Sequence, residues 1–244
     1  MRKKVKITYS QVGDNYDTKD PIKKLAQLAA RQTIILNQSG FKEITQSRGE
    51  SAFVWKVGKI TMASVIEGLG TKNLVADAMH KITGKTYYDI IGHDTVATII
   101  NDLVTVGANP LVVHAYWAIE DNSWLQDRER MKDLINGWRD ACKLSGAVWG
   151  GGETPTLKGI IEHQTVDLGG SAVGIIKSEK ALITDRKLKI GDRIVFIKSA
   201  GINANGISLA RAISKKLPKG YATKINANKM YGEALLTSTN IYAN

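Results

Sequence analysis

The chain has 244 residues, of which 43% are hydrophobic and 23% are charged, and its net charge is +11. This composition excludes a disordered chain and predicts one or two folded domains with a substantial core. Because no apolar run approaches the roughly 20 residues that cross a bilayer, and residues 1–6 lead into no apolar signal core, we expect a cytoplasmic protein without a membrane partner.

The positive charge is concentrated in the C-terminal part of the chain. Residues 177–244 contain 13 Lys and Arg against 4 Asp and Glu, whereas residues 1–176 are nearly balanced. The C-terminal lysines have no interleaved aromatic side chain apart from Tyr221. The pattern therefore favours a solvated basic face over a nucleic-acid groove.

Hydrophobic periodicity predicts the elements of the first half. Alternating residues at 51–66 predict a β-hairpin with Gly58 and Lys59 at its turn. Apolar residues at helical spacing in 87–107 predict a buried helix that ends at Gly107.

The later elements follow the same reasoning. Residue patterns predict a core strand at 111–119, an amphipathic helix at 126–145 ended by Gly146, and strands at 147–149 and 165–176. Beyond residue 176 they predict a strand at 192–199, a Gly/Asn loop at 200–206, a helix at 207–217 and a helical segment from Lys229 onward. Cys142 is expected to be a buried small residue in a reducing compartment. Strands and helices in this order predict a mixed α/β (α+β) fold with a domain boundary near Ile176.

Three segments rich in glycine and carboxylates are candidates for chemistry, and the first is residues 67–72 (EGLGTK). Gly68 and Gly70 let the backbone approach a ligand and leave amide groups free ahead of a helix, which suits phosphate. Lys72 could add a cation and Glu67 a metal ligand. The segment matches neither common glycine-rich phosphate motif, so a bare strand-to-helix turn is the alternative.

The second candidate is a polar stripe on the helix predicted at 87–107. Its members on one helical face are Asp94, Thr98, Asn101 and Thr105, with Asp102 beside them. An ordinary solvent face, which is the alternative, would use better helix formers such as Lys and Glu. Short oxygen-bearing side chains suit Mg²⁺, which needs one or two carboxylates when phosphates and water complete its shell. His93 is expected to pack rather than to bind metal, since no second His lies at ligand spacing.

The third candidate is residues 150–155 (GGGETP), after a short apolar strand. Three consecutive glycines are a costly way to build a turn, so they predict a backbone that approaches a ligand. Glu153 could coordinate a metal or bind a substrate amide, and a structural loop is the alternative. The sequence has no pattern typical of covalent catalysis, whereas phosphoryl transfer needs mainly positioning and charge neutralisation.

Together these segments resemble the phosphoribosylformylglycinamidine cyclo-ligase (aminoimidazole ribonucleotide synthetase) family. The matching segments are residues 67–72, 91–110 (IGHDTVATIINDLVTVGANP), 151–154 (GGET), 167–180 (DLGGSAVGIIKSEK) and 199–213 (SAGINANGISLARAI), with looser similarity at 9–17 and 234–242. The chain departs from the family in having Glu67 for an Asp and residues 45–52 (TQSRGESA) for a glycine-rich segment. Family members also continue past residue 244.

The resemblance implies two αβ domains. An N-terminal half-barrel at 1–176 would bind ATP and form a homodimer, and residues 177–244 would begin an incomplete C-terminal αβ domain. ATP and Mg²⁺ are the implied cofactors. The implied reaction is ATP-dependent cyclisation of formylglycinamidine ribonucleotide to aminoimidazole ribonucleotide in purine biosynthesis, which forms a C–N bond.

Combined with the residue patterns, the resemblance gives three sets of candidate site residues. The catalytic candidates are Glu153, Thr154 and Lys72. The cofactor-binding candidates are Gly68, Gly70, Thr71, Lys72, Asp94, Asn101, Gly151 and Gly152. The metal candidates are Glu67, Asp94, Asn101 and Asp102. The alternatives are another ATP-using member of the same superfamily, such as thiamine-monophosphate kinase, and a catalytically silent nucleotide-binding homologue.

Overall fold

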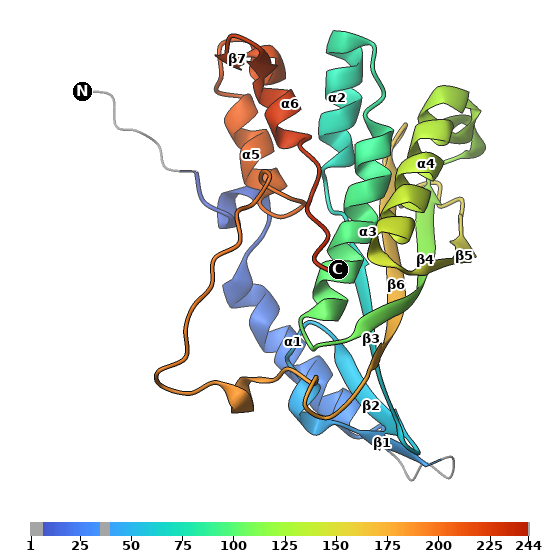
Figure 1. Ribbon diagram of the computed structural model, residues 1–244. Helices are drawn as coiled ribbons and strands as arrows, with labels where there is room; N and C mark the ends of the chain where they lie inside the picture. The colour runs from blue at the N-terminus through green and yellow to red at the C-terminus, as the bar shows by residue number, and fades with distance from the viewer. Residues whose placement is uncertain (1–6, 35–39, 244) are drawn as a thin grey trace.

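The computed structural model describes residues 7–34 and 40–243 and arranges them around a six-stranded sheet (Figure 1). The basic residues at 1–6 lie outside the described part. In spatial order the strands are β1 (Phe41–Glu43), β2 (Phe53–Val57), β3 (Ile60–Gly68), β6 (Val166–Ile176), β4 (Asn109–Ile119) and β5 (Val148–Glu153). Neighbouring strands are antiparallel except for β4 and β5, which are parallel. The predicted mixed α/β fold is confirmed.

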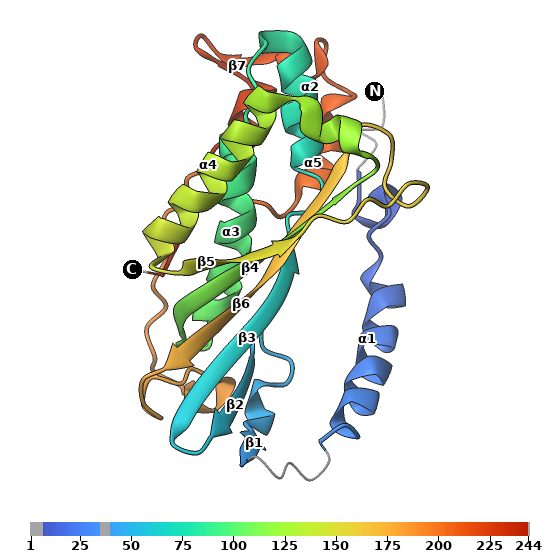
Figure 2. The same ribbon diagram turned by 90° about the vertical axis from the view of Figure 1, so that its right-hand side faces the viewer.

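Helices cover one face of this sheet (Figure 2). They are α2 (Asn73–Thr83), α3 (Tyr88–Val104) and α4 (Arg128–Ser145). Two glycines of β6 let α3 lie close to the sheet. A Cβ at Gly170 would lie 2.9 Å from Cδ1 of Ile99, and one at Gly174 would lie 3.1 Å from Cδ2 of Leu103.

Helices α3 and α4 cross closely because each has a glycine at the crossing. A Cβ at Gly92 would lie 2.4 Å from the carbonyl oxygen of Leu134, and one at Gly137 would lie 1.9 Å from that of Asp89. No larger side chain fits either position without moving a helix. The crossing and the sheet together fix the position of α3, which carries the polar stripe.

Among the described residues, the other face of the sheet is largely uncovered, and we call it the open face. Trp55 stacks between Phe53 and Phe41, with ring centroids 5.9 Å and 6.4 Å away, and Ile66 is 80% exposed. Helix α1 (Tyr16–Arg31) stands on this side of the molecule (Figure 2), and it buries no residue.

Most predicted elements of the first half are confirmed. In the β2–β3 hairpin Val57 pairs with Ile60, and Gly58 has a φ of 59° at the turn. Helix α4 ends at Gly146, whose φ of 71° is the left-handed conformation that a glycine cap adopts. Cys142 is buried in α4, as expected.

Four details were predicted incorrectly. Residues 192–199 form no strand, and Phe196 is 91% exposed. A strand with apolar residues on both faces needs neighbours on both sides, and no described residue pairs with this one. The last two helices are shorter than expected, as α5 (Ile207–Ser214) and α6 (Tyr231–Leu235). Residues 150–153 belong to β5 and not to a loop.

The remaining elements are short. They are the hairpin strands β7 (Lys224–Asn226) and β8 (Lys229–Met230) and the 3₁₀ turns η1 (Ser10–Val12), η2 (Thr45–Ser47), η3 (Asn122–Gln126), η4 (Asp185–Lys187) and η5 (Gly220–Ala222). Among the helices that the structure describes, none has the length and apolar character needed to span a membrane.

Candidate functional site

The loop between β3 and α2 carries the first candidate segment and lies at one end of the sheet. Its start is fixed by backbone pairing, since Glu67 lies opposite Gly170 and the amide of Leu69 donates to Leu168 at 2.8 Å. Gly70 has a φ of 72°, which a residue with a side chain rarely adopts. The sequence therefore needs this glycine to turn the chain from strand to helix.

Two carboxylates meet beside this loop, Glu67 at the end of β3 and Asp102 on α3. Burial, followed by the charge of Glu67 and a hydrogen bond with it, raises the pKa of Asp102 to about 6. In such a pair the charge of one carboxylate disfavours ionisation of the other, and a proton or a cation between them relieves the repulsion. The pair is consistent with a hard cation, which prefers carboxylate oxygens.

Lys72 lies at the start of α2 and is completely buried. Its ammonium group contacts the carboxylate of Asp94 and donates to the backbone oxygens of Asn203 and Thr237 at 3.0 Å each. Burial lowers the pKa of Lys72, and the charge of Asp94 opposes that shift. Because an ammonium group has three protons, all of its donors are satisfied by the chain. In this structure Lys72 holds segments together and offers no free donor to a phosphate.

Asp94 and Asn101 are also engaged by the chain, through residues 239–242. One carboxylate oxygen of Asp94 accepts from the amide of Thr239 at 2.8 Å, while the other contacts Lys72. The side-chain amide of Asn101 donates to the oxygen of Asn240 at 2.8 Å and accepts from the amide of Tyr242 at 3.0 Å. The segment lies along α3 near the C-terminus (Figure 1), so it covers this part of the polar stripe.

The stripe is thus divided between two roles. Thr98 and Thr105 donate to carbonyl oxygens of their own helix, those of Asp94 and Asp102. His93 does not lie among metal ligands, since its Nε2 donates to the oxygen of Thr239 at 2.9 Å. Of the four metal candidates, Glu67 and Asp102 come together, while Asp94 and Asn101 bind the C-terminal segment. Within the described residues, no three His, Cys, Asp or Glu side chains are grouped as a metal site.

The third candidate segment lies elsewhere on the sheet. Glu153 at the end of β5 pairs with Tyr116 and lines a hollow of about 460 Å³ together with Ile66, His114 and Ser171. Ile66 belongs to the open face, whereas its neighbour Glu67 meets Asp102 on the helix-covered face. The structure therefore does not bring Glu153 to the carboxylate pair.

Close packing against a neighbouring strand explains two of the three glycines of this segment. A Cβ at Gly152 would lie 2.2 Å from the oxygen of Ala115, and one at Gly150 would lie 2.8 Å from Nε2 of His114. They allow close packing against β4. Gly151 has a φ of 104° with open space around it, and Thr154 is exposed. These two positions are accessible to a ligand.

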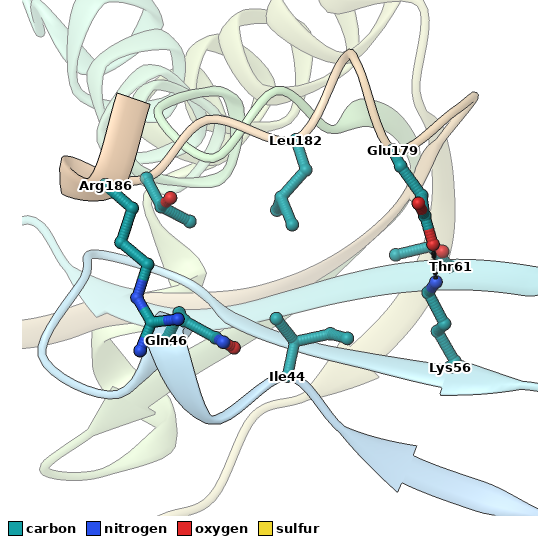
Figure 3. Close-up of a pocket in the computed structure, with 8 residues that line it drawn as sticks. Ile44, Gln46, Lys56, Thr61, Glu179, Leu182 and Arg186 are labelled. Carbon is teal, nitrogen blue, oxygen red and sulfur yellow. Dashed lines mark hydrogen bonds and ion pairs between the residues drawn. The ribbon is translucent and has the colours of Figure 1, made fainter. Parts of the chain in front are cut away.

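A separate hollow of about 260 Å³ lies between the strands β2 and β3 and the segment that follows β6 (Figure 3). Ile44, Leu182 and Arg186 line it, and Lys56 pairs with Glu179 at its edge. None of the candidate site residues contributes to it.

Sequence reasoning missed the residues that border the β3–α2 loop from distant segments. Tyr9 and Asp14 of the N-terminal segment and residues 204–208 line a hollow of about 200 Å³ with the loop. Arg211 of α5 lines a larger one on another side of the same loop. The available signals were the glycine-rich character of the loop at 200–206 and the family resemblance of residues 199–213 and 9–17, which include these positions.

Comparisons with known proteins identify relatives across nearly the whole chain. The family model for the AIR synthase related protein N-terminal domain matches residues 49–176. Phosphoribosylformylglycinamidine cyclo-ligase of Thermococcus kodakarensis is 32% identical, with 97% of this chain and 66% of the relative covered. The enzyme of the same name from Methanobrevibacter smithii is 31% identical, with coverage of 97% and 65%. The chain therefore spans about two thirds of the length of the curated relatives it matches.

Solved structures show a weaker likeness. Thiamine monophosphate kinase from Aquifex aeolicus aligns with a TM-score of 0.42 and 13% identity, with 70% of this chain and 45% of that chain covered. A complex of AaThiL with AMPPCP and TMP aligns with a TM-score of 0.45 and 11% identity, with coverage of 70% and 44%. The sequence relatives therefore carry the family assignment.

We predict that Lys72→Met releases the C-terminal segment from α3. The substitution leaves the carboxylate of Asp94 buried without its cation, and such a loss destabilises proteins by about 3 kcal/mol or more. Hydrogen exchange at the amides of Thr239 and Tyr242 should accelerate at least tenfold, while Lys81→Met, an exposed change on the same helix, should leave it unaltered. Adding Asp94→Asn to the variant should restore part of the lost stability. Unchanged exchange in Lys72→Met would contradict this role.

The carboxylate pair makes a prediction about pH. Because the pKa of Asp102 is raised to about 6 in the folded state, the folded chain binds this proton more tightly than the unfolded chain. The stability that this group contributes is fully present below about pH 4 and is lost as the pH rises through about 6. The carboxyl carbon of Asp102 should titrate near 6 by NMR. Glu67→Gln should lower the titration midpoint of Asp102, whereas Asp89→Asn, on the same helix as Asp102, should not. A titration midpoint near 4 for Asp102 in the parent would refute the pairing.

Proposed function

Because the chain belongs to the AIR synthase related family, we propose that it binds ATP with Mg²⁺ and takes part in the cyclisation of formylglycinamidine ribonucleotide. The observation that carries the proposal is the Glu67–Asp102 carboxylate pair beside the Gly68–Gly70 loop. A nucleotide triphosphate needs a cation site and a backbone that its phosphates can approach, and these two features adjoin here.

Glu67 and Asp102 are the residues that we propose to hold the cation. Because the pKa of Asp102 is about 6, this carboxyl group is mostly ionised at neutral pH, and a divalent cation would offset its repulsion with Glu67. When bound, Mg²⁺ supplies charge neutralisation for the phosphates of ATP. Asp94 serves in this scheme as a positioning residue, because Lys72 and Thr239 engage its oxygens.

The reaction proposed from the family transfers the γ-phosphoryl group of ATP to the amide oxygen of the substrate and releases ADP. An internal nitrogen then attacks the activated carbon and expels phosphate, which closes the imidazole ring with a new C–N bond. The loop at Gly68, Gly70 and Thr71 would position the phosphates, and the chain supplies this site without a covalent intermediate on the protein. Glu153 and Thr154 remain proposed active-site residues of the accessible third segment.

We also propose that two copies of the chain join through the open faces of their sheets, with residues 1–176 as the nucleotide-binding and dimerisation domain. The aromatic ladder of Phe41, Trp55 and Phe53 and the exposed Ile66 supply apolar surface there. Apolar patches of this kind on a folded chain are typical of interfaces. Nucleotide synthesis and a single cysteine, Cys142, are consistent with a cytoplasmic location.

Nucleotide binding is tested by thermal stability. ATP with Mg²⁺ at about a hundred times its dissociation constant should stabilise the parent by about 2.7 kcal/mol and raise its Tm by several degrees. Glu67→Gln and Asp102→Asn should lose the Mg²⁺-dependent part of this shift, and Asp89→Asn should retain it. Formation of ADP and an aminoimidazole from formylglycinamidine ribonucleotide tests the chemistry. A parent that ATP and Mg²⁺ do not stabilise would refute the nucleotide site.

The proposed dimer is tested by one charge on the open face. Ile66→Lys should convert a species of twice the chain mass into the monomer, because it places an ammonium group in the apolar contact. Ile82→Lys makes the same change at an exposed position of α2, and it should leave the mass unchanged. Light scattering after size exclusion gives both masses. A monomeric parent, or a dimer that tolerates Ile66→Lys, would argue against this interface.

A further inference from the structure

A hollow of about 480 Å³ lies beside the β3–α2 loop, on a different side from the one lined by residues 204–208. The start of β6, the start of α2 and α5 meet at this end of the sheet (Figure 2). Gly70, Thr71, Asn73, Glu162, Asp167 and Arg211 are among the residues that line it. Its volume is within the range of about 300–1,000 Å³ that is typical of small-molecule sites.

Arg211 is the unusual member of this lining. It is half-buried, yet its guanidinium group has no hydrogen bond or ion pair with any described residue. The other half-buried arginines of the described chain, Arg48 and Arg130, do have acceptors, the carboxylate of Glu43 and the backbone oxygen of Trp124. No nitrogen of Arg211 is among the buried polar atoms without a partner, so its guanidinium group is open to solvent and a ligand that enters the hollow can reach it. An oxyanion there would supply the acceptors that the described chain does not.

The walls around Arg211 are held in place by other contacts. The side-chain amide of Asn73 donates to the backbone oxygen of Val166 at 2.8 Å, which ties α2 to β6. The hydroxyl groups of Thr71 and Ser208 lie 3.5 Å apart, which places the loop next to α5. The hollow therefore has fixed walls on three elements, and Arg211 lines it from the C-terminal part of the chain.

We infer that this hollow binds the phosphate-bearing substrate, with Arg211 as the residue that recognises the phosphate. A guanidinium group pairs with two oxygens of a phosphate at once. Glu162 and Asp167 contribute carboxyl groups to the lining, which suit a ligand that also carries hydrogen-bond donors such as ribose hydroxyls or an amidinium group. Naming this ligand as formylglycinamidine ribonucleotide rests on the proposed function.

This placement gives the β3–α2 loop two ligands. The carboxylate pair at Glu67 and Asp102 serves the nucleotide, and the hollow under Arg211 serves the substrate, with Gly70 and Thr71 contributing to both. A phosphoryl transfer requires its two reactants at adjacent positions, and one loop between two sites provides that. The residues that grip the substrate phosphate are then already present in this chain.

The test removes the Arg211 side chain and the ligand's phosphate, separately and together, and compares the resulting losses of binding free energy. Calorimetry in the absence of ATP measures binding of formylglycinamidine ribonucleotide, of its dephosphorylated nucleoside and of ribose 5-phosphate to the parent and to Arg211→Gln. We expect the substitution to weaken both phosphorylated ligands about tenfold or more and to leave nucleoside binding unchanged. Lys215→Gln removes an exposed charge one turn away on the same surface, and it should change none of the three affinities.

Two results would overturn the inference: equal affinity of Arg211→Gln and the parent for the ribonucleotide, or an equal loss for ribonucleotide and nucleoside. The Tm shift with ATP and Mg²⁺ is measured on the same samples as a check on folding. If ATP fails to bind the parent while Arg211 still discriminates the phosphate, the nucleotide proposal fails and the substrate site stands. If ATP binds both proteins and Arg211→Gln binds the ribonucleotide as tightly as the parent does, the substrate site is refuted and the nucleotide proposal stands.

Discussion

The buried ion pair between Lys72 and Asp94 is the interaction on which the rest of the site depends. It joins the start of α2 to α3, and through the oxygens of Asn203 and Thr237 it binds two segments from the C-terminal part. A buried charge pair of this kind adds little net stability, but the loss of one partner is severe. Its contribution is therefore mainly geometric, because it determines which polar groups near the loop remain available to ligands.

The carboxylates around the loop divide accordingly. Asp94 has chain partners for both oxygens, whereas Glu67 and Asp102 repel each other at neutral pH and are stabilised by a proton or a cation. The glycine loop lies beside this carboxylate pair, and Arg211 lies on the other side of that loop without an acceptor among the described residues. We propose that the carboxylate pair takes a metal–nucleotide on one side of the loop and that the guanidinium group takes a phosphorylated substrate on the other.

The sequence predicted local structure well and long-range roles less well. The Gly58 turn, the Gly146 cap and the buried face of α3 follow from residue-level rules, and the structure has all three. Residues 150–153 were expected to form a ligand loop because the sequence does not reveal that Gly152 packs against Ala115 of a neighbouring strand. Lys72 was likewise expected to contact phosphate because its long-range partners are not visible in the sequence. Its acceptors are the backbone oxygens of Asn203 and Thr237, which lie more than a hundred residues away in the sequence. No local sequence pattern predicts that these segments contact Lys72.

The central claim is that the cation site lies at Glu67 and Asp102, with Asp94 kept for structure. A crystal structure with Mn²⁺ and a non-hydrolysable ATP analogue tests this most directly, because anomalous scattering locates the metal independently of the protein atoms. The account predicts one metal peak in contact with the carboxylates of Glu67 and Asp102, while Asp94 remains paired with Lys72. A peak coordinated by Asp94 and Asn101, with residues 239–242 displaced from α3, would contradict it.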